Sequence, residues 1–154
     1  MRPHLRCLIL AALSVSVSLW AADPAIGTWK LNLAKSKYSP GPPPKSATIT
    51  YEAHGDGITR TGQSVGADGH TTSLQYTANF DGKDYPVTGS STADTIALKR
   101  IDAHTGEATL KKGGKTVSTA RRVVSQDGKT LTLTIKGTNA QGQPMHNVAV
   151  YEKQ

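Results

Sequence analysis

Cysteine is almost absent from this chain of 154 residues, and the only one, Cys7, lies in an apolar stretch near the start. The rest of the chain therefore forms no disulfides and has no thiol chemistry, although small exported domains often depend on disulfides. Long apolar runs are also absent, because the stretch from Cys7 to Trp20 has about fourteen residues and a membrane-spanning helix needs roughly 20. The sequence thus excludes a disulfide scaffold and a transmembrane helix.

The first residues are typical of a secretory signal, which we place at residues 1–22. Basic residues precede the apolar stretch and small residues suited to cleavage follow it: Arg2, His4, Arg6, Ala21 and Ala22. Residues 23–154 then form one domain of about 130 residues. We expect this domain in the bacterial periplasm or outside the cell.

Aromatic residues make up only 5% of the chain. A transmembrane β-barrel needs aromatic girdles and apolar outward faces, and the outward positions here carry Thr, Lys, Asn and Gln, so that architecture is rejected. The net charge is +7, and about +5 without the two arginines of the signal. Because the lysines are scattered among turns and the chain is exported, we expect a solvated surface and no nucleic-acid partner.

Glycine turns recur along the remaining chain, between runs rich in Thr, Val, Ile and Tyr. The turn signals are Gly55-Asp56-Gly57, Asp68-Gly69, Asp81-Gly82, Gly89-Ser90, Gly113-Gly114, Asp127-Gly128 and Gln141-Gly142. The expected strands span about 27–33, 46–53, 58–65, 72–80, 83–88, 94–101, 106–111, 115–124, 130–138 and 146–152. We predict an all-β, up-and-down antiparallel β-barrel of about ten strands, since closure removes exposed edges.

Apolar residues alternate with polar ones in several of these strands, as expected when one face is buried. The residues expected on inward faces include Trp29, Leu31 and Leu33, then Leu74, Tyr76, Ala78 and Phe80, and also Leu131, Leu133 and Ile135. Residues 34–46 break the pattern with Ser39-Pro40-Gly41-Pro42-Pro43-Pro44, which favours an extended polyproline strap. This strap is either a stiff covering loop or, alternatively, a lid or docking segment.

The opening Gly27-Thr28-Trp29 resembles the Gly-x-Trp strand of the calycins, which include lipocalins, fatty-acid-binding proteins and avidins. The ten expected strands, the Gly114-Lys115-Thr116 and Asp127-Gly128-Lys129 turns and the terminal Tyr151-Glu152-Lys153 resemble the fatty-acid-binding branch most. The resemblance covers about residues 26–153 and implies a ligand-binding barrel. The proline strap departs from it, because that branch has a helical lid at this place.

The same resemblance implies a partial carboxylate clamp. Fatty-acid-binding proteins hold the ligand's carboxylate with an arginine in the eighth strand and an Arg-x-Tyr pair in the last. Arg121 matches the first arginine and Tyr151 the tyrosine, but Ala149 stands where the second arginine would be. The resemblance therefore supports a lipocalin-like or calycin-like barrel without naming fatty acid as its ligand.

Arginines share strand faces with apolar residues at three places: Arg60 with Ile58, Arg100 with Ile96 and Leu98, and Arg121 with Val117 and Val123. If those faces point inward, the charges need a carboxylate, water or an anionic ligand group. The candidate ligand-binding residues are Arg121, Arg60, Arg100, Tyr151, Tyr76 and Tyr51. The alternative is that a bulge turns these arginines to the rim or outward, with Arg122 replacing Arg121.

Signals for catalysis or metal binding are weak. The histidines after the signal are His54, His70, His104 and His146, and none has a partner at metal-ligand spacing. No Gly-x-Ser-x-Gly elbow, phosphate loop or paired carboxylates are present. We expect no metal, no cofactor and no enzyme activity. A barrel enzyme such as an isomerase or cyclase is a third hypothesis, after the two that follow.

The leading hypothesis is a monomeric, exported binding protein with a small ligand in the barrel lumen. The ligand is expected to be apolar or amphipathic, and the arginines admit an anionic group. The alternative is a filled barrel that acts through its surface as an interaction or inhibitor module of the bacterial envelope.

Overall fold

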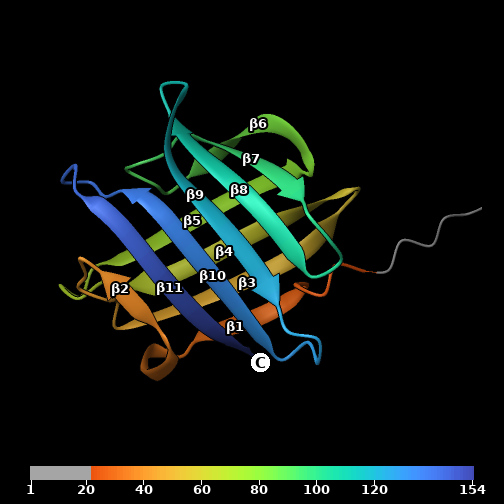
Figure 1. Ribbon diagram of the computed structural model, residues 1–154, viewed down its shortest axis with the longest axis horizontal. Helices are drawn as coiled ribbons and strands as arrows, with labels where there is room; N and C mark the ends of the chain where they lie inside the picture. Colours follow the sequence, from red (N-terminus) through yellow and green to blue (C-terminus); the bar gives the residue numbers. More distant parts are fainter. Residues whose placement is uncertain (1–21) are drawn as a thin grey trace, which may run out of the picture.

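The computed structural model describes residues 22–154, so the proposed signal lies outside the described residues except for Ala22. The described chain forms one antiparallel sheet in the order β1-β3-β4-β5-β6-β7-β8-β9-β10-β11-β2, and a further pairing of β1 with β11 closes it (Figure 1). The strands are β1 (Gly27–Leu31), β2 (Lys37–Ser39), β3 (Ser46–His54), β4 (Gly57–Val65), β5 (Thr71–Asn79), β6 (Asp81–Thr88), β7 (Thr95–Arg100), β8 (Thr105–Lys112), β9 (Lys115–Val124), β10 (Thr130–Thr138) and β11 (Pro144–Lys153).

Apart from the short β2, these strands make the predicted closed barrel of ten. Each expected strand is present, and most boundaries agree within two residues, as at 115–124 and 130–138. The glycine turns explain this agreement. Gly113 and Gly114 have φ values of +55° and +78°, the left-handed backbone that a two-residue hairpin between β8 and β9 requires.

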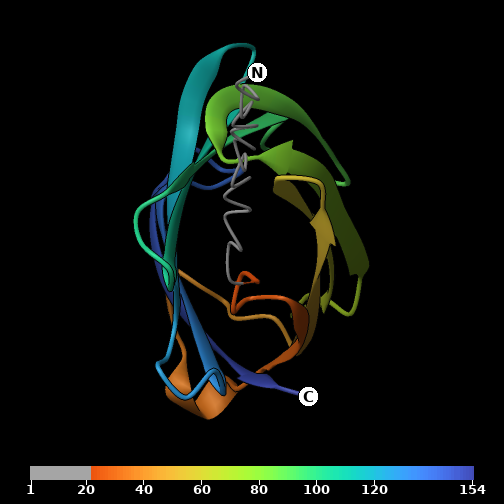
Figure 2. The ribbon, with the colours of Figure 1, turned by 90° about the vertical axis from the view of Figure 1, so that its right-hand side faces the viewer.

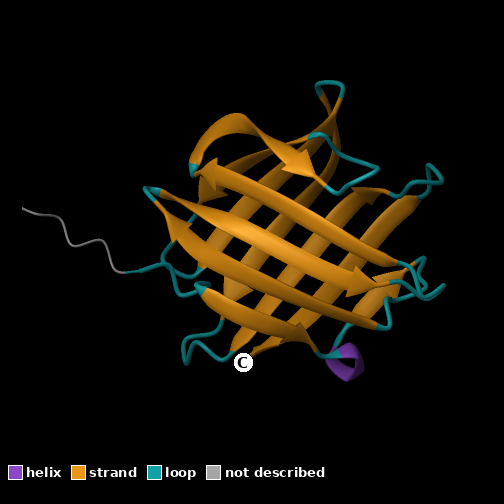
Figure 3. Ribbon diagram, turned by 180° about the vertical axis from the view of Figure 1, so that it is seen from behind, coloured by secondary structure: helices purple, strands orange, loops and turns teal. Residues whose placement is uncertain are grey.

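The first strand is interrupted, contrary to the single strand expected at 27–33. β1 ends at Leu31, a 3-10 helix η1 (Leu33–Lys35) follows, and β2 then rejoins β11 farther along (Figure 3). Leu33 is 41% exposed, so the prediction that it shares the buried face of Trp29 and Leu31 was wrong. Part of the expected strap at residues 34–46 is therefore a strand beside β11.

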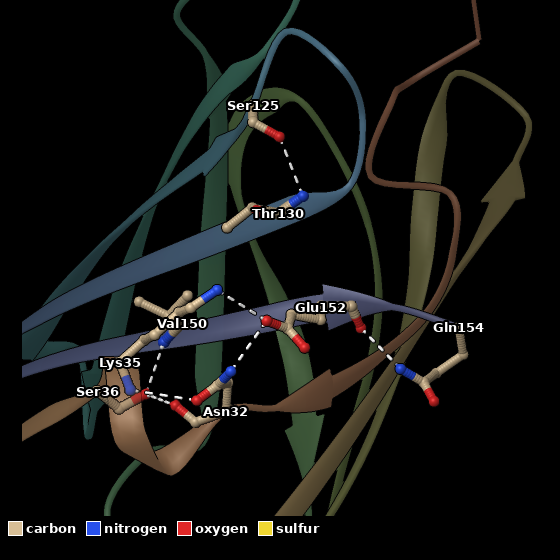
Figure 4. Close-up of polar contacts among 8 residues, drawn as sticks. All are labelled: Asn32, Lys35, Ser36, Ser125, Thr130, Val150, Glu152 and Gln154. Atoms are coloured by element: carbon tan, nitrogen blue, oxygen red, sulfur yellow. Dashed lines mark hydrogen bonds and ion pairs between the residues drawn. The ribbon is translucent and has the colours of Figure 1, made fainter.

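Ser36 connects the interrupted strand to β11. Its Oγ donates to the Asn32 carbonyl at 2.7 Å and accepts from the Val150 amide at 2.9 Å, while the Asn32 amide donates to the Val150 carbonyl at 2.8 Å (Figure 4). Asn32 and Lys35 also converge on the Glu152 carboxylate. The interruption between β1 and β2 is thus held by side chains where the backbone ladder is broken.

The most deeply buried large side chains of the barrel lie toward the end where β1 begins. The largest fully buried side chains are Trp29, Ile49, Leu131 and Val124. The Trp29 indole donates to the Ala25 carbonyl at 2.7 Å, which fixes residues 22–26 at this end. Figure 2 shows this start of the described chain, in red, inside the ring of strands. The expected inward position of Trp29 is confirmed.

The seam between β5 and β6 has the fewest paired residues of the barrel's hairpins. Only Gln75 with Thr88 and Tyr76 with Val87 are in register, whereas β4 and β5 pair along their whole length. The next position on β6 is Pro86, which has no amide hydrogen to continue the ladder. The strands therefore separate toward their connecting turn.

None of the helices formed by residues 22–154 is long and apolar enough to cross a membrane.

Candidate functional site

A cavity of about 140 Å³ lies in the barrel lumen. Its walls are mostly apolar side chains from both halves of the barrel: Ile58, Leu74, Phe80, Ile96, Leu98, Ala108, Leu110, Ala120, Leu133 and Ile135. Its polar side chains include Arg60, Arg122, Tyr51 and Tyr76. The lumen therefore joins an apolar wall to a cationic and hydroxyl-bearing region.

Arg60 enters this cavity from β4, in register between Tyr51 on β3 and Tyr76 on β5. Its guanidinium lies over Gly62, where a Cβ atom would come within 2.8 Å of Nη1. The Nη1 atom is buried and has no hydrogen-bond partner. Within residues 22–154, no carboxylate lies within ion-pair distance of Arg60, so its charge is uncompensated there.

The three predicted tyrosines are all buried, and Tyr51 and Tyr76 line the cavity. Burial raises the pKa of Tyr76, with a further rise from Tyr51, against the opposing charges of Arg60 and Arg122. Burial likewise raises the pKa of Tyr151, which packs in the core beside the cavity rather than in its wall. The phenol of Tyr76 therefore keeps its proton at neutral pH and can donate a hydrogen bond to an anion in the cavity.

Arg121 lies on the outside of the barrel, so its predicted place in the lumen was wrong. Its side chain is 55% exposed and Nη1 is 3.3 Å from Oε1 of Glu107 on the neighbouring strand. The cause is a register shift between β8 and β9, where Leu110 pairs with Ser118 and Lys111 with Thr116, leaving Val117 unpaired. A bulge reverses which residues face inward.

Arg122 occupies the inward position instead, as the alternative reading allowed. It is buried, its guanidinium lies 5.1 Å from the centre of the Tyr51 ring, and its Nε has no partner. Burial alone would lower the pKa of Arg122, but interactions with Tyr51 and Asp23 outweigh it and raise the pKa. Arg122 therefore stays charged in the lumen.

Arg100 is inward-facing but belongs to the closed end of the barrel. Its guanidinium stacks 4.2 Å from the centre of the Phe80 ring, and Nη1 lies 3.4 Å from Oδ2 of Asp23. The same Oδ2 accepts from Nη2 of Arg122 at 2.8 Å. Asp23 had no signal in the sequence, because it meets its partners only through the folding of residues 22–26 across the barrel end.

Within the described residues, no group of three or more His, Cys, Asp or Glu side chains could hold a metal ion. The site offers cation, phenol and apolar surface rather than ligands for a metal.

No family model and no curated protein matches the chain. Among solved structures, zebrafish ileal bile acid-binding protein complexed with cholic acid aligns with a TM-score of 0.54 and 16% identity, over 85% of this chain and 99% of that one. Rv2717c from M. tuberculosis aligns with a TM-score of 0.50 and 20% identity, over 85% and 93%. The chain has a calycin-like fold. At these identities, the similarity of this chain to both proteins shows a shared fold and nothing more.

Proposed function

We propose that this calycin-like barrel binds a small amphipathic anion in its lumen. The observation that carries the proposal is Arg60, whose guanidinium enters a mostly apolar cavity with a buried, unpartnered Nη1 and no carboxylate partner among the described residues. An uncompensated charge in such surroundings is unfavourable, and an anionic ligand group would neutralise it. The phenols of Tyr51 and Tyr76 would donate further hydrogen bonds to the same group.

The size of the cavity limits the ligand. A volume of about 140 Å³ is well below the roughly 300–1,000 Å³ of sites for drug-sized molecules. It is close to the roughly 150 Å³ of an engineered apolar cavity that holds benzene. We therefore propose a compact ligand with one ring or a short branched chain and one acidic group. The solved complex of a calycin-like barrel with cholic acid supports ligand binding in this fold.

The test is native mass spectrometry of the protein purified from the cells that produce it. We expect a bound small mass that is released on denaturation. Arg60→Gln should raise the Kd for this ligand at least tenfold, because a hydrogen bond to a charged group contributes about 1.5–3 kcal/mol, and the bound mass should be correspondingly depleted. Arg121→Gln is the matched control, since it removes the same charge from the outer surface and should leave the ligand bound.

A clean apo mass, with no uptake of small aromatic acids, would overturn the proposal. The alternative of a filled barrel that acts through its surface as an envelope interaction module would then stand. A bound mass that Arg60→Gln leaves unchanged would also overturn the role given to Arg60.

We further propose that the barrel acts outside the cytoplasm, as an exported monomer. The support is the basic, apolar and small-residue order of residues 1–22. N-terminal sequencing of the protein from a periplasmic or secreted fraction should begin at Ala22 or Asp23. A start at Met1 in such a fraction would contradict cleavage.

A further inference from the structure

Asp23 is an acidic side chain that reaches the closed end of the lumen. Its side chain is only 6% exposed, and Oδ2 lies 2.8 Å from Nη2 of Arg122 and 3.4 Å from Nη1 of Arg100. Oδ1 accepts from the Ala25 amide at 2.9 Å, and the Asp23 carbonyl accepts from the Ile26 amide at 3.0 Å. The carboxylate is thus fixed by its own backbone turn as well as by both arginines.

The three inward arginines therefore differ in electrostatic state. Arg122 and Arg100 share the carboxylate of Asp23, whereas Arg60 has no acidic partner among residues 22–154. Arg60 and Arg122 both line the cavity, and the positive charge of each lowers the pKa of Tyr76 against the effect of burial. An anion entering the lumen consequently meets one free guanidinium and one that is already engaged.

We propose that Asp23 is an internal counter-ion that determines ligand specificity by occupying Arg122 and Arg100, so that the lumen accepts singly charged anions and discriminates against doubly charged ones. The inference rests on the proposed binding of an anion at Arg60. A second anionic group would have to displace Asp23 from its two ion pairs, or bind the unpartnered Nε of a guanidinium whose charge Asp23 already neutralises. Displacement is costly, because it leaves the buried Asp23 carboxylate without its partners and the incoming anion must also lose its hydration.

The first test uses inorganic sulfate as the probe and needs no knowledge of the natural ligand. We compare the midpoint of thermal unfolding in sulfate and in chloride at equal ionic strength. Sulfate stabilises folded proteins in general by exclusion from their surface, so the wild-type difference between sulfate and chloride is the baseline. In Asp23→Asn, which keeps the size of the side chain, the difference should exceed this baseline by several degrees. Asp56→Asn is the matched control: it removes the same charge from an exposed turn at the same end of the barrel and should show the wild-type difference.

The excess sulfate effect should disappear in the double variant Asp23→Asn/Arg122→Gln, because the released guanidinium is then gone. A sulfate effect in a folded Asp23→Asn protein that does not exceed the wild-type baseline would overturn the inference. The wild-type protein gives an independent test if Asp23→Asn does not fold. A sulfate-specific stabilisation of the wild type that Arg122→Gln abolishes would show that Asp23 does not shield this arginine.

The second test measures selectivity with two probes that share one ring, benzoate and isophthalate, by calorimetric titration. The ratio of the isophthalate Kd to the benzoate Kd should fall at least tenfold in Asp23→Asn and stay constant in Asp56→Asn. An unchanged ratio would overturn the inference while leaving the proposed function intact. Benzoate binding that Arg60→Gln leaves unchanged, together with an excess sulfate effect in Asp23→Asn, would instead overturn the role given to Arg60 and leave the shielding of Arg122 by Asp23 standing.

Discussion

Two residues on one strand, Arg60 and Gly62, explain how a charged side chain can lie along the wall of a narrow barrel. Side chains two apart on a strand point to the same face, so Gly62 is the position over which Arg60 must lie. A Cβ there would stand 2.8 Å from Nη1 and 2.9 Å from Cζ of the arginine. The absence of a side chain at Gly62 is thus what sets the position of the guanidinium.

Gly62→Ala should displace the guanidinium of Arg60 and weaken anion binding about tenfold. The unfolding free energy should change by less than about 1 kcal/mol, because the group that must move is the end of a flexible side chain and glycine is itself unfavourable in strands by roughly 0.5–1 kcal/mol. Calorimetric titration with benzoate and urea unfolding would measure the two effects.

The control for this prediction is a double-mutant cycle with Arg60→Gln. If Gly62 acts through Arg60, adding Gly62→Ala to Arg60→Gln should cause no further loss of binding. Additive losses would show that Gly62 shapes the cavity independently of the arginine.

In the interruption after β1, one side-chain hydroxyl takes the place of a backbone hydrogen bond between strands. Ser36 Oγ bonds both the Asn32 carbonyl and the Val150 amide, so one side chain makes two of the hydrogen bonds that hold the interruption. Ser36→Ala should lower the unfolding free energy by about 1 kcal/mol. The amide of Val150 should also exchange its hydrogen faster, as measured by nuclear magnetic resonance.

A matched comparison for that variant is Ser64→Ala, which removes an exposed hydroxyl that bonds only the Thr72 side chain on the next strand. We expect it to change the unfolding free energy by less than half as much. An equal loss in both variants would indicate that the loss of any hydroxyl hydrogen bond, and not its place in the interruption, accounts for the effect of Ser36.

The location of the strands could be predicted from the sequence because their signals are local. Glycine turns lie directly beside the strands that they delimit, and the alternation of apolar and polar residues lies within the strands themselves. A bulge depends on how a strand pairs with its neighbour, so the unpaired Val117 left no readable pattern even within the β8–β9 hairpin. The interruption after Leu31 depends on pairing with the distant strand β11. The apolar Val123 on the outer face, 38% exposed, added to the misplacement of Arg121.

The candidate site could be predicted only in part for the same reason. Arg60, Tyr51 and Tyr76 lie in strands without a bulge, so their expected faces are the observed ones. Asp23 and Arg122 are separated by 99 positions, and their ion pair depends on how residues 22–26 close the barrel. No spacing within the sequence could have brought these two residues together.

Every pair of neighbouring strands in the barrel is joined by hydrogen bonds, but β5 and β6 have only two residue pairs in register. Local opening should therefore be easiest there. We expect amides at the turn ends of β5 and β6 to exchange at least tenfold faster than those between β10 and β11, which pair along nine positions. Equal protection in the two hairpins would contradict this expectation.

The pH limits of the whole molecule follow from two sets of ionisable groups. Hydrogen bonds from backbone amides lower the pKa of Asp68 and Asp102, and a side-chain hydrogen bond from Ser125 with an amide lowers that of Asp127. A lowered pKa in the folded state contributes stability above the ordinary carboxyl value, and this stability is lost as the pH falls below about 4. Because these side chains are exposed, we expect the loss on the acid side to be gradual.

The alkaline limit should be steeper, since burial raises the pKa of Tyr76 and Tyr151 in the folded state. Their contribution is complete below the ordinary tyrosine pKa of about 10 and is lost as the pH rises above it, because only the unfolded chain then releases the protons. The unfolding free energy, measured in urea between about pH 8 and 11, should therefore fall above pH 10. Tyr151→Phe should flatten this fall, because it removes one of the buried phenols whose ionisation favours the unfolded state. An identical slope in the wild type and in Tyr151→Phe would show that the buried phenol does not determine the alkaline limit.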